Sequence, residues 1–221
     1  MKIQKTLTTL TIASILSLSL GGLMYAADNT FTDLGSIPGK DKIIALHEQG
    51  FIKGVTETEF RPEAILTNAQ AIQFITKGLQ LNLRTMKFIK APLASDNFTH
   101  VKNDAWFAEA FINAFYNNID LPKDIDPSKS MTKEQFTYHL VKGVEKAGNL
   151  PMIKLLPVSI TDEKEITSMY QGAIQRSLTW NINTLTSGEK FNPQSEITRA
   201  DAAVMIFNAL EFLKTQTVEI Q

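Results

Sequence analysis

Apolar residues recur at helical spacing in three similar stretches of the chain. Downstream of Thr67, Thr132 and Thr198, the positions four, eight and twelve residues later are all apolar. Spacing by four places such side chains on one face of a helix. The pattern therefore predicts three amphipathic helices of about four turns, each beginning at its threonine.

A shorter helical pattern precedes each of these helices. The shorter helices are expected to end at Gly50, Asn118 and Asn181, residue types that tolerate the left-handed backbone at helix termini. An apolar residue follows each stop and is placed to fold back on the helix. The predicted unit is therefore a lead-in segment, a helix, a loop and a second helix.

The landmarks around the long helices repeat in register. A proline precedes each threonine by five residues, an apolar residue precedes the proline by two, and the copies are separated by 65 and 66 residues. Self-similarity of this kind indicates tandem structural repeats. The expected domains are a secretory signal peptide at 1–27 and repeats at 28–80, 81–146 and 147–221, the last with a C-terminal tail. The expected fold class is mainly α.

The N-terminus has the three parts of a secretory signal. Lys2 and Lys5 precede an apolar run from about residue 7 to residue 20, and small residues follow. Cleavage is expected after Ala26 or Ala27, and an uncleaved membrane anchor is the alternative. The mature protein is therefore expected to be secreted, with no membrane contact after cleavage.

Composition excludes several classes of protein. The 221 residues are 43% hydrophobic and 20% charged, as in soluble globular proteins. Cysteine is absent, which excludes disulfides, cysteine-ligated metals and a lipoprotein anchor. Loss of the signal segment removes two lysines and takes the formal charge from −1 to −3 (20 basic against 23 acidic residues). No basic stripe remains, so a nucleic-acid partner is not expected.

The three threonines are predicted helix N-caps. Each is followed three residues later by a side chain able to return a bond to the cap, namely Gln70, Gln135 and Asp201. Helix initiation alone explains this pattern.

The residue after each cap differs between the copies. It is Asn68, Lys133 and Arg199 in turn. A cation at the first helical position opposes the helix dipole, at a cost of about 0.3–1 kcal/mol when exposed. A nearby anion would reverse the sign, because the helix end and a guanidinium together form a carboxylate site. The alternative is a surface pair with Glu196 or simple solvation.

Other chemistry is sparse. The histidines lie in different repeats without metal-ligand spacing: His47, His100 and His139. The aspartates of "IDLPKDIDP" (Asp120, Asp124 and Asp126) suggest a cation loop but lack the glycine and terminal glutamate of an EF-hand. No catalytic triad or phosphate loop occurs. No enzyme activity, cofactor or metal is expected.

At this point the pattern resembles the S-layer homology (SLH) domain, in three tandem divergent copies. The resemblance rests on "FTDL" and "GFIKG", and on "FRPEAILTNAQA", "IDPSKSMTKEQF" and "FNPQSEITRADA". It covers nearly the whole mature chain. The second copy is the weakest, with His100 in place of the lead aspartate and Lys133 in place of the motif arginine.

The resemblance implies a pseudo-threefold spindle of three helix-loop-helix repeats around a central helical bundle. SLH trios bind secondary cell-wall polysaccharide of Gram-positive bacteria without covalent linkage, often through a pyruvate ketal, and the motif arginine is expected to meet the ketal carboxylate. The residues that it implies for glycan binding are Arg199, Lys133, Asp33 and Asp162, with Trp106 as an aromatic lining.

The resemblance also implies a location at the cell wall or surface layer of a Gram-positive bacterium. Only Arg199 keeps the motif arginine, and Lys133 keeps the charge without the planar fork. The alternative function is therefore a divergent SLH module with weakened sugar sites, acting as a structural or protein-interaction component. Other surface-layer proteins would then be its partners.

Overall fold

In the described part of the chain, the fold is built from six α-helices joined by loops. The computed structural model describes residues 31–151 and 156–218, and the predicted signal peptide lies outside them. Within these ranges, β-structure is limited to isolated bridges. The mainly-α class predicted from the sequence is confirmed. The helices are α1 (Lys40–Glu48), α2 (Asn68–Gly78), α3 (Ala108–Tyr116), α4 (Lys133–Ala147), α5 (Gln171–Thr179) and α6 (Arg199–Val218), with 3-10 turns η1 (Ala94–Asp96), η2 (Glu163–Glu165) and η3 (Ser168–Tyr170).

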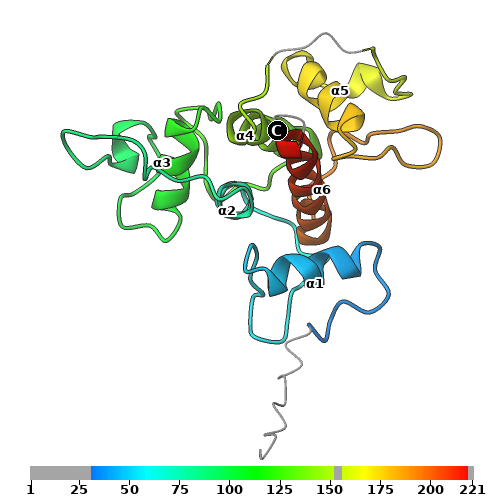
Figure 1. The fold of residues 1–221 in the computed structure, drawn as a ribbon, viewed down its shortest axis with the longest axis horizontal. Coiled ribbons are helices and arrows are strands. Elements are labelled where there is room, and N and C mark those ends of the chain that lie inside the picture. The colour runs from blue at the N-terminus through cyan, green and yellow to red at the C-terminus, as the bar shows by residue number, and fades with distance from the viewer. Residues whose placement is uncertain (1–30, 152–155, 219–221) are drawn as a thin grey trace, which may run out of the picture.

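The long helices form the centre and the short helices lie outside them (Figure 1). Each of α2, α4 and α6 contacts the other two, whereas α1 packs against α6, α3 against α2, and α5 against α4. Lobe 1 is residues 31–62, lobe 2 is residues 98–127 and lobe 3 is residues 159–193, and they carry α1, α3 and α5 respectively. The first and last repeats are therefore joined, because lobe 1 rests on the last helix.

A closed ring of backbone hydrogen bonds joins the three repeats before the long helices begin. The N–H of Leu66 donates to Ile197 (3.0 Å), that of Ile197 to Met131 (2.9 Å), and that of Met131 to Leu66 (3.0 Å). All three side chains are buried. The ring fixes the starting points of α2, α4 and α6 relative to one another.

The short helices end where the sequence predicts. Gly50, Asn118 and Asn181 have φ of 74°, 61° and 55°. The apolar residue after each stop then bonds back into its helix, as the N–H of Phe51 does to the carbonyl of Leu46 (2.9 Å). These bonds satisfy carbonyls that a helix end leaves free.

The main apolar core runs through the central helices into all three lobes, and a smaller separate cluster lies within lobe 3. Phe60 and Phe191, from the turns after the short helices, are fully buried. Within the described ranges, no helix has the length and apolar character needed to cross a membrane.

Candidate functional site

The predicted N-cap threonines all accept a backbone hydrogen bond at a helix start. Thr67 and Thr132 form complete capping boxes with Gln70 and Gln135. Thr198 accepts the N–H of Asp201 at 3.1 Å, and the described residues contain no return bond from the shorter aspartate.

The first N–H groups of the long helices are already bonded to the loop of another repeat. The N–H of Asn68 donates to Lys129 (2.7 Å), and that of Arg199 donates to Ala64 (2.9 Å). The next N–H of α6, from Ala200, donates to Pro62 (3.0 Å). The expectation that the helix end itself holds a carboxylate is therefore wrong for α6, since these donors are used.

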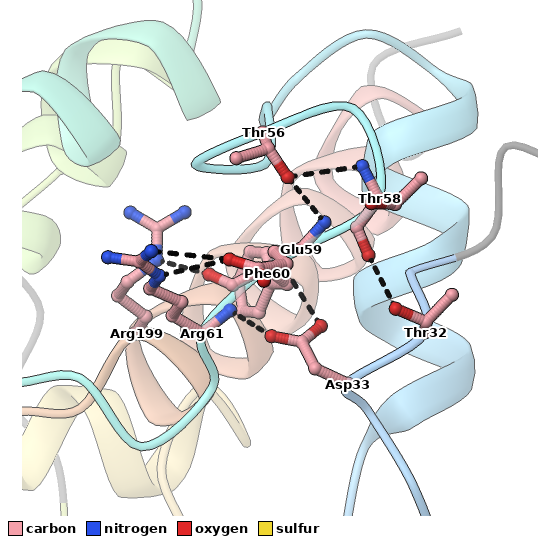
Figure 2. A network of polar contacts seen from close by, with 8 residues as sticks. All are labelled: Thr32, Asp33, Thr56, Thr58, Glu59, Phe60, Arg61 and Arg199. Atoms are coloured by element: carbon pink, nitrogen blue, oxygen red, sulfur yellow. Dashed lines mark hydrogen bonds and ion pairs between the residues drawn. The ribbon is translucent and has the colours of Figure 1, made fainter.

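Arg199 lies against lobe 1, although the two are 139 residues apart at their hydrogen bond (Figure 2). Its Nε donates to the carbonyl of Phe60 (2.7 Å), and one Nη donates to the carbonyl of Lys53 (3.2 Å). The guanidinium also lies over the rings of Phe60 and Phe74, at 4.7 and 4.8 Å. Carbonyl oxygens and ring faces thus compensate for the unfavourable helix dipole.

The charge of Arg199 persists at neutral pH although the residue is only 7% exposed. Burial lowers the pKa of Arg199 to about 10, and the nearby charge of Asp33 opposes that change. The predicted alternative partner, Glu196, instead accepts a hydrogen bond from Ser130. The second Nη of Arg199 makes no hydrogen bond within the described residues and is not enclosed.

Asp33 and Asp162 hold equivalent turns in lobes 1 and 3. Asp33 accepts the N–H groups of Phe60 (2.9 Å) and Arg61 (2.6 Å), as Figure 2 shows, and Asp162 accepts those of Phe191 and Asn192 (2.8 and 2.7 Å). Burial favours a higher pKa for both carboxyl groups, but these hydrogen bonds outweigh it and lower each pKa. Both aspartates are thus engaged with backbone.

The two turns require this support because one residue in each is left-handed. Arg61 and Asn192 have φ of 58° and 57°, which costs free energy in residues other than glycine. In lobe 2 the lead residue is His100, and the equivalent Asp126 has no positive φ. Asp126 instead accepts bonds from the N–H and hydroxyl of Ser128. Lobe 2 therefore lacks both the lead aspartate and the left-handed residue of the turn.

A pocket of about 290 Å³ lies between lobe 1 and α2, and Arg199 lines it. The loop 50–55 forms one wall, and Gln73, Phe74 and Lys77 form the α2 wall. The N–H groups of Lys53 and Gly54 make no hydrogen bonds within the described residues. A side chain at Gly54 would lie 2.3 Å from the Thr56 carbonyl, so only glycine fits there. We call this space the lobe 1 pocket.

Lys133 occupies the equivalent place against lobe 3 but is enclosed differently. Its Nζ lies 4.7 Å from the centre of the Phe191 ring. Burial lowers the pKa of Lys133, and the charges of Asp201 and Asp162 oppose this change. The structure thus brings Lys133 and Asp162 together in lobe 3, and Arg199 and Asp33 together in lobe 1.

Asn68, the first residue of α2, is bonded to lobe 2. Its amide donates to the carbonyl of Asp126 at 2.8 Å. Trp106 also belongs to lobe 2 and lines a pocket of about 550 Å³ with Asp126 and the N-cap Thr67; it is 61% exposed and packs edge-on against Phe107. Among the described residues, no group of three or more histidines and acids is placed to hold a metal ion.

Sequence reasoning missed the α2 wall of the pocket and the buried Glu134. Glu134 accepts bonds from the N–H and hydroxyl of Thr167 (2.9 and 2.7 Å) and from Gln194 (3.0 Å). The sequence does set Glu134 apart, because the other two copies have alanine at the equivalent position. Gln73 differs in a similar way, since it is polar where the third copy has Val204, and Lys77 is charged where the third copy has the neutral Asn208.

Comparison with protein families gives matches in the first and third repeats. The family model described as "S-layer homology domain" matches residues 30–72 and 159–203. These are the repeats that carry Asp33 and Asp162 and the left-handed turns.

Curated relatives match over most of this chain. They include exoglucanase XynX of Acetivibrio thermocellus (27% identical, 82% of this chain, 16% of the relative) and amylopullulanase of Thermoanaerobacterium thermosulfurigenes (27%, 85% and 10%). A third is the surface-layer 125 kDa protein of Lysinibacillus sphaericus (24%, 81% and 15%). The chain therefore spans a sixth or less of the length of these relatives. The resemblance seen in the sequence is confirmed for residues 30–72 and 159–203, which match the S-layer homology domain model.

Proposed function

We propose that this chain attaches non-covalently to the bacterial cell wall and that the lobe 1 pocket binds an anionic sugar of the wall polysaccharide. The SLH matches and the surface-layer relative support attachment to the cell surface. A pyruvylated secondary cell-wall polysaccharide of a Gram-positive wall is the proposed ligand. The protein would act after secretion, as a binding module without catalysis.

The position of Arg199 is the main reason to propose an anionic ligand. One edge of its guanidinium is bonded to carbonyls, and the other edge is open at the lobe 1 pocket. The ligand carboxylate would accept from the free Nη and from the unbonded N–H groups of Lys53 and Gly54. Lys77, exposed on the facing wall, adds a second positive charge.

Three of the residues implied for glycan binding receive revised roles in this proposal. Asp33 would position the turn that bonds Arg199, and Asp162 would do the same for the turn beside Lys133. Lys133 would contribute little to glycan binding, because its ammonium group lies over the Phe191 ring and cannot form the two parallel hydrogen bonds that a guanidinium makes to a carboxylate.

The test is sedimentation of the protein with purified cell wall, before and after acid removal of the ketal. Arg199→Ala is expected to weaken binding at least about tenfold, because a hydrogen bond to a charged group contributes about 1.5–3 kcal/mol. Ketal removal should weaken wild-type binding by at least as much. Unchanged wild-type binding after both alterations would contradict the proposal.

Matched variants separate binding from folding. Arg61→Ala removes an exposed cation of the neighbouring turn whose side chain is paired with Glu59; because its charge also acts on Arg199, it should weaken binding much less than Arg199→Ala does. Lys77→Ala alters the pocket without touching the core and should weaken binding by about threefold to tenfold. If Arg199→Ala unfolds, Lys77→Ala still decides the outcome.

A protein-interaction function is the second candidate, and a specific observation favours it. Phe88 and Ile89 are exposed on the connector beside lobe 2, where apolar residues are available to a partner. Failure to bind any pyruvylated wall, with the fold intact, would favour this alternative.

A further inference from the structure

A second groove adjoins the lobe 1 pocket along α2. It lies between α2 and α3 and has a volume of about 410 Å³, within the range of about 300–1,000 Å³ that is usual for small-molecule sites. We call it the α2–α3 groove. Gln73 and Lys77 line both it and the lobe 1 pocket, so the two spaces are adjacent across one helix face.

The groove is lined by polar side chains that have no partner within the described residues. The chain provides amides, two cations and one carboxylate there, from Gln73, Lys77, Gln80, Arg84, Glu109 and Asn113. None of these side-chain groups takes part in a hydrogen bond or ion pair in the described part of the chain. Such a set offers donors and acceptors in several directions, as a hydroxyl-rich ligand requires.

Trp106 closes one edge of the groove with an exposed aromatic face. It is 61% exposed and contacts Phe107 edge-on, with 5.2 Å between ring centres. An exposed indole beside unpaired amides suits a pyranose ring, whose C–H face packs on the aromatic surface while its hydroxyls reach the polar wall.

We propose that the α2–α3 groove is a subsite for a neutral, hydroxyl-rich sugar that adjoins the anionic sugar held by Arg199. The polysaccharide would cross α2 over Gln73 and Lys77, with its anionic end in the lobe 1 pocket and the following sugar on Trp106. The site would therefore recognise at least two linked sugars. This inference rests on the proposed function of the lobe 1 pocket.

The experiment compares an isolated anionic terminal sugar with an oligosaccharide released from the wall. The oligosaccharide is expected to bind the wild type about five- to tenfold more tightly than the terminal sugar. Trp106→Ala should remove that difference while leaving the affinity for the terminal sugar unchanged. Phe115→Ala, an exposed aromatic of the same lobe at the end of α3, is the control and should change neither affinity.

Fluorescence gives an independent measurement, because the chain has two tryptophans with opposite exposure. Trp180 is 8% exposed and stacks on Phe212, so quenching by acrylamide reports mainly on Trp106. The oligosaccharide should protect the fluorescence from quenching, and the terminal sugar should not.

The outcomes distinguish the two proposals. If Trp106→Ala keeps the oligosaccharide advantage while Arg199→Ala abolishes binding, the subsite is wrong and the lobe 1 pocket stands. If no sugar binds to the folded wild type, the proposed function fails, and the subsite fails with it. Equal affinity of the wild type for both sugars also overturns the subsite.

Discussion

The three places where a long helix begins against another repeat's lobe differ in their openness. At junction 1, Arg199 and α2 face lobe 1 and leave the lobe 1 pocket open. At junction 2, Asn68 and α4 face lobe 2, and the hydroxyl of Tyr138 donates to Asp120 across the space (2.9 Å). The α4 side of lobe 2 is therefore bridged where the α2 side of lobe 1 is open, although a separate pocket of about 550 Å³ lies between the start of α2 and lobe 2.

Junction 3, where Lys133 and α6 face lobe 3, is also bridged. Asn208 on α6 accepts from the Nζ of Lys42 (2.7 Å) and donates to the carbonyl of Ile182 (3.0 Å). If the lobe 1 pocket is the site that binds the wall, a motif cation such as Lys133 is insufficient by itself. The adjoining helix face must also leave its polar groups unpaired, as α2 does with Gln73 and Lys77.

The largest predicted effect concerns His139, which occupies on α4 the place that Phe74 has on α2. Burial lowers the pKa of His139 to about 4, and its Nδ1 has no hydrogen-bond partner in the described residues. Because the folded pKa lies below the ordinary value of 6.5, the stability from neutral His139 is complete above about pH 6.5 and is lost as pH falls toward 4. The loss is about 3 kcal/mol in the free energy of unfolding.

The check is urea unfolding at pH 7, 5.5 and 4.5 for the wild type and His139→Phe. The variant should lose less stability than the wild type on acidification, whatever its stability at pH 7. Parallel pH profiles for the two proteins would show that junction 2 contains no buried neutral histidine.

The second prediction compares the equivalent turns held by Asp33 and Asp162, which should affect stability equally but wall binding differently. Asp33→Ala and Asp162→Ala should each lower the free energy of unfolding by about 2 kcal/mol, because each leaves two backbone N–H groups without a charged acceptor. Only Asp33→Ala should also weaken wall binding, because its turn carries the Phe60 carbonyl that holds Arg199.

Urea unfolding and wall sedimentation measure the two effects. His100→Ala, at the corresponding exposed position of lobe 2, is the control and should change stability by less than about 0.5 kcal/mol. Equal loss of wall binding in both aspartate variants would contradict the difference between junctions 1 and 3.

Much of the fold was available from the sequence because it depends on local chemistry. The capping threonines and the left-handed stops act within a few residues of themselves, so Thr67 or Gly50 can be recognised from neighbouring residues. The packing partners are not local. Nothing in the periodicity of α1 indicates that it packs against α6 rather than α2.

The candidate site was only half predictable for the same reason. Arg199 stood out because it opposes its own helix dipole, but its partners Phe60 and Lys53 belong to the first repeat. Loop length gave a partial signal: Pro62 lies twelve positions after Gly50 and Pro193 twelve after Asn181, whereas Pro127 lies nine after Asn118, so the spacing sets lobe 2 apart but does not distinguish lobe 1 from lobe 3. The longer loop supplies the wall of the lobe 1 pocket.

The smallest predicted effect tests whether the cation alone makes a site. Lys133→Arg gives junction 3 a guanidinium over Phe191, as Arg199 lies over Phe60. Wall binding should change by less than about twofold, because Asn208 still bridges the junction. The double variant Lys133→Arg with Asn208→Ala removes that bridge and should bind more tightly than either single variant, since a second site adds avidity. A gain from Lys133→Arg alone, measured by sedimentation with the same wall preparation, would mean that the bridge is irrelevant and that the guanidinium decides.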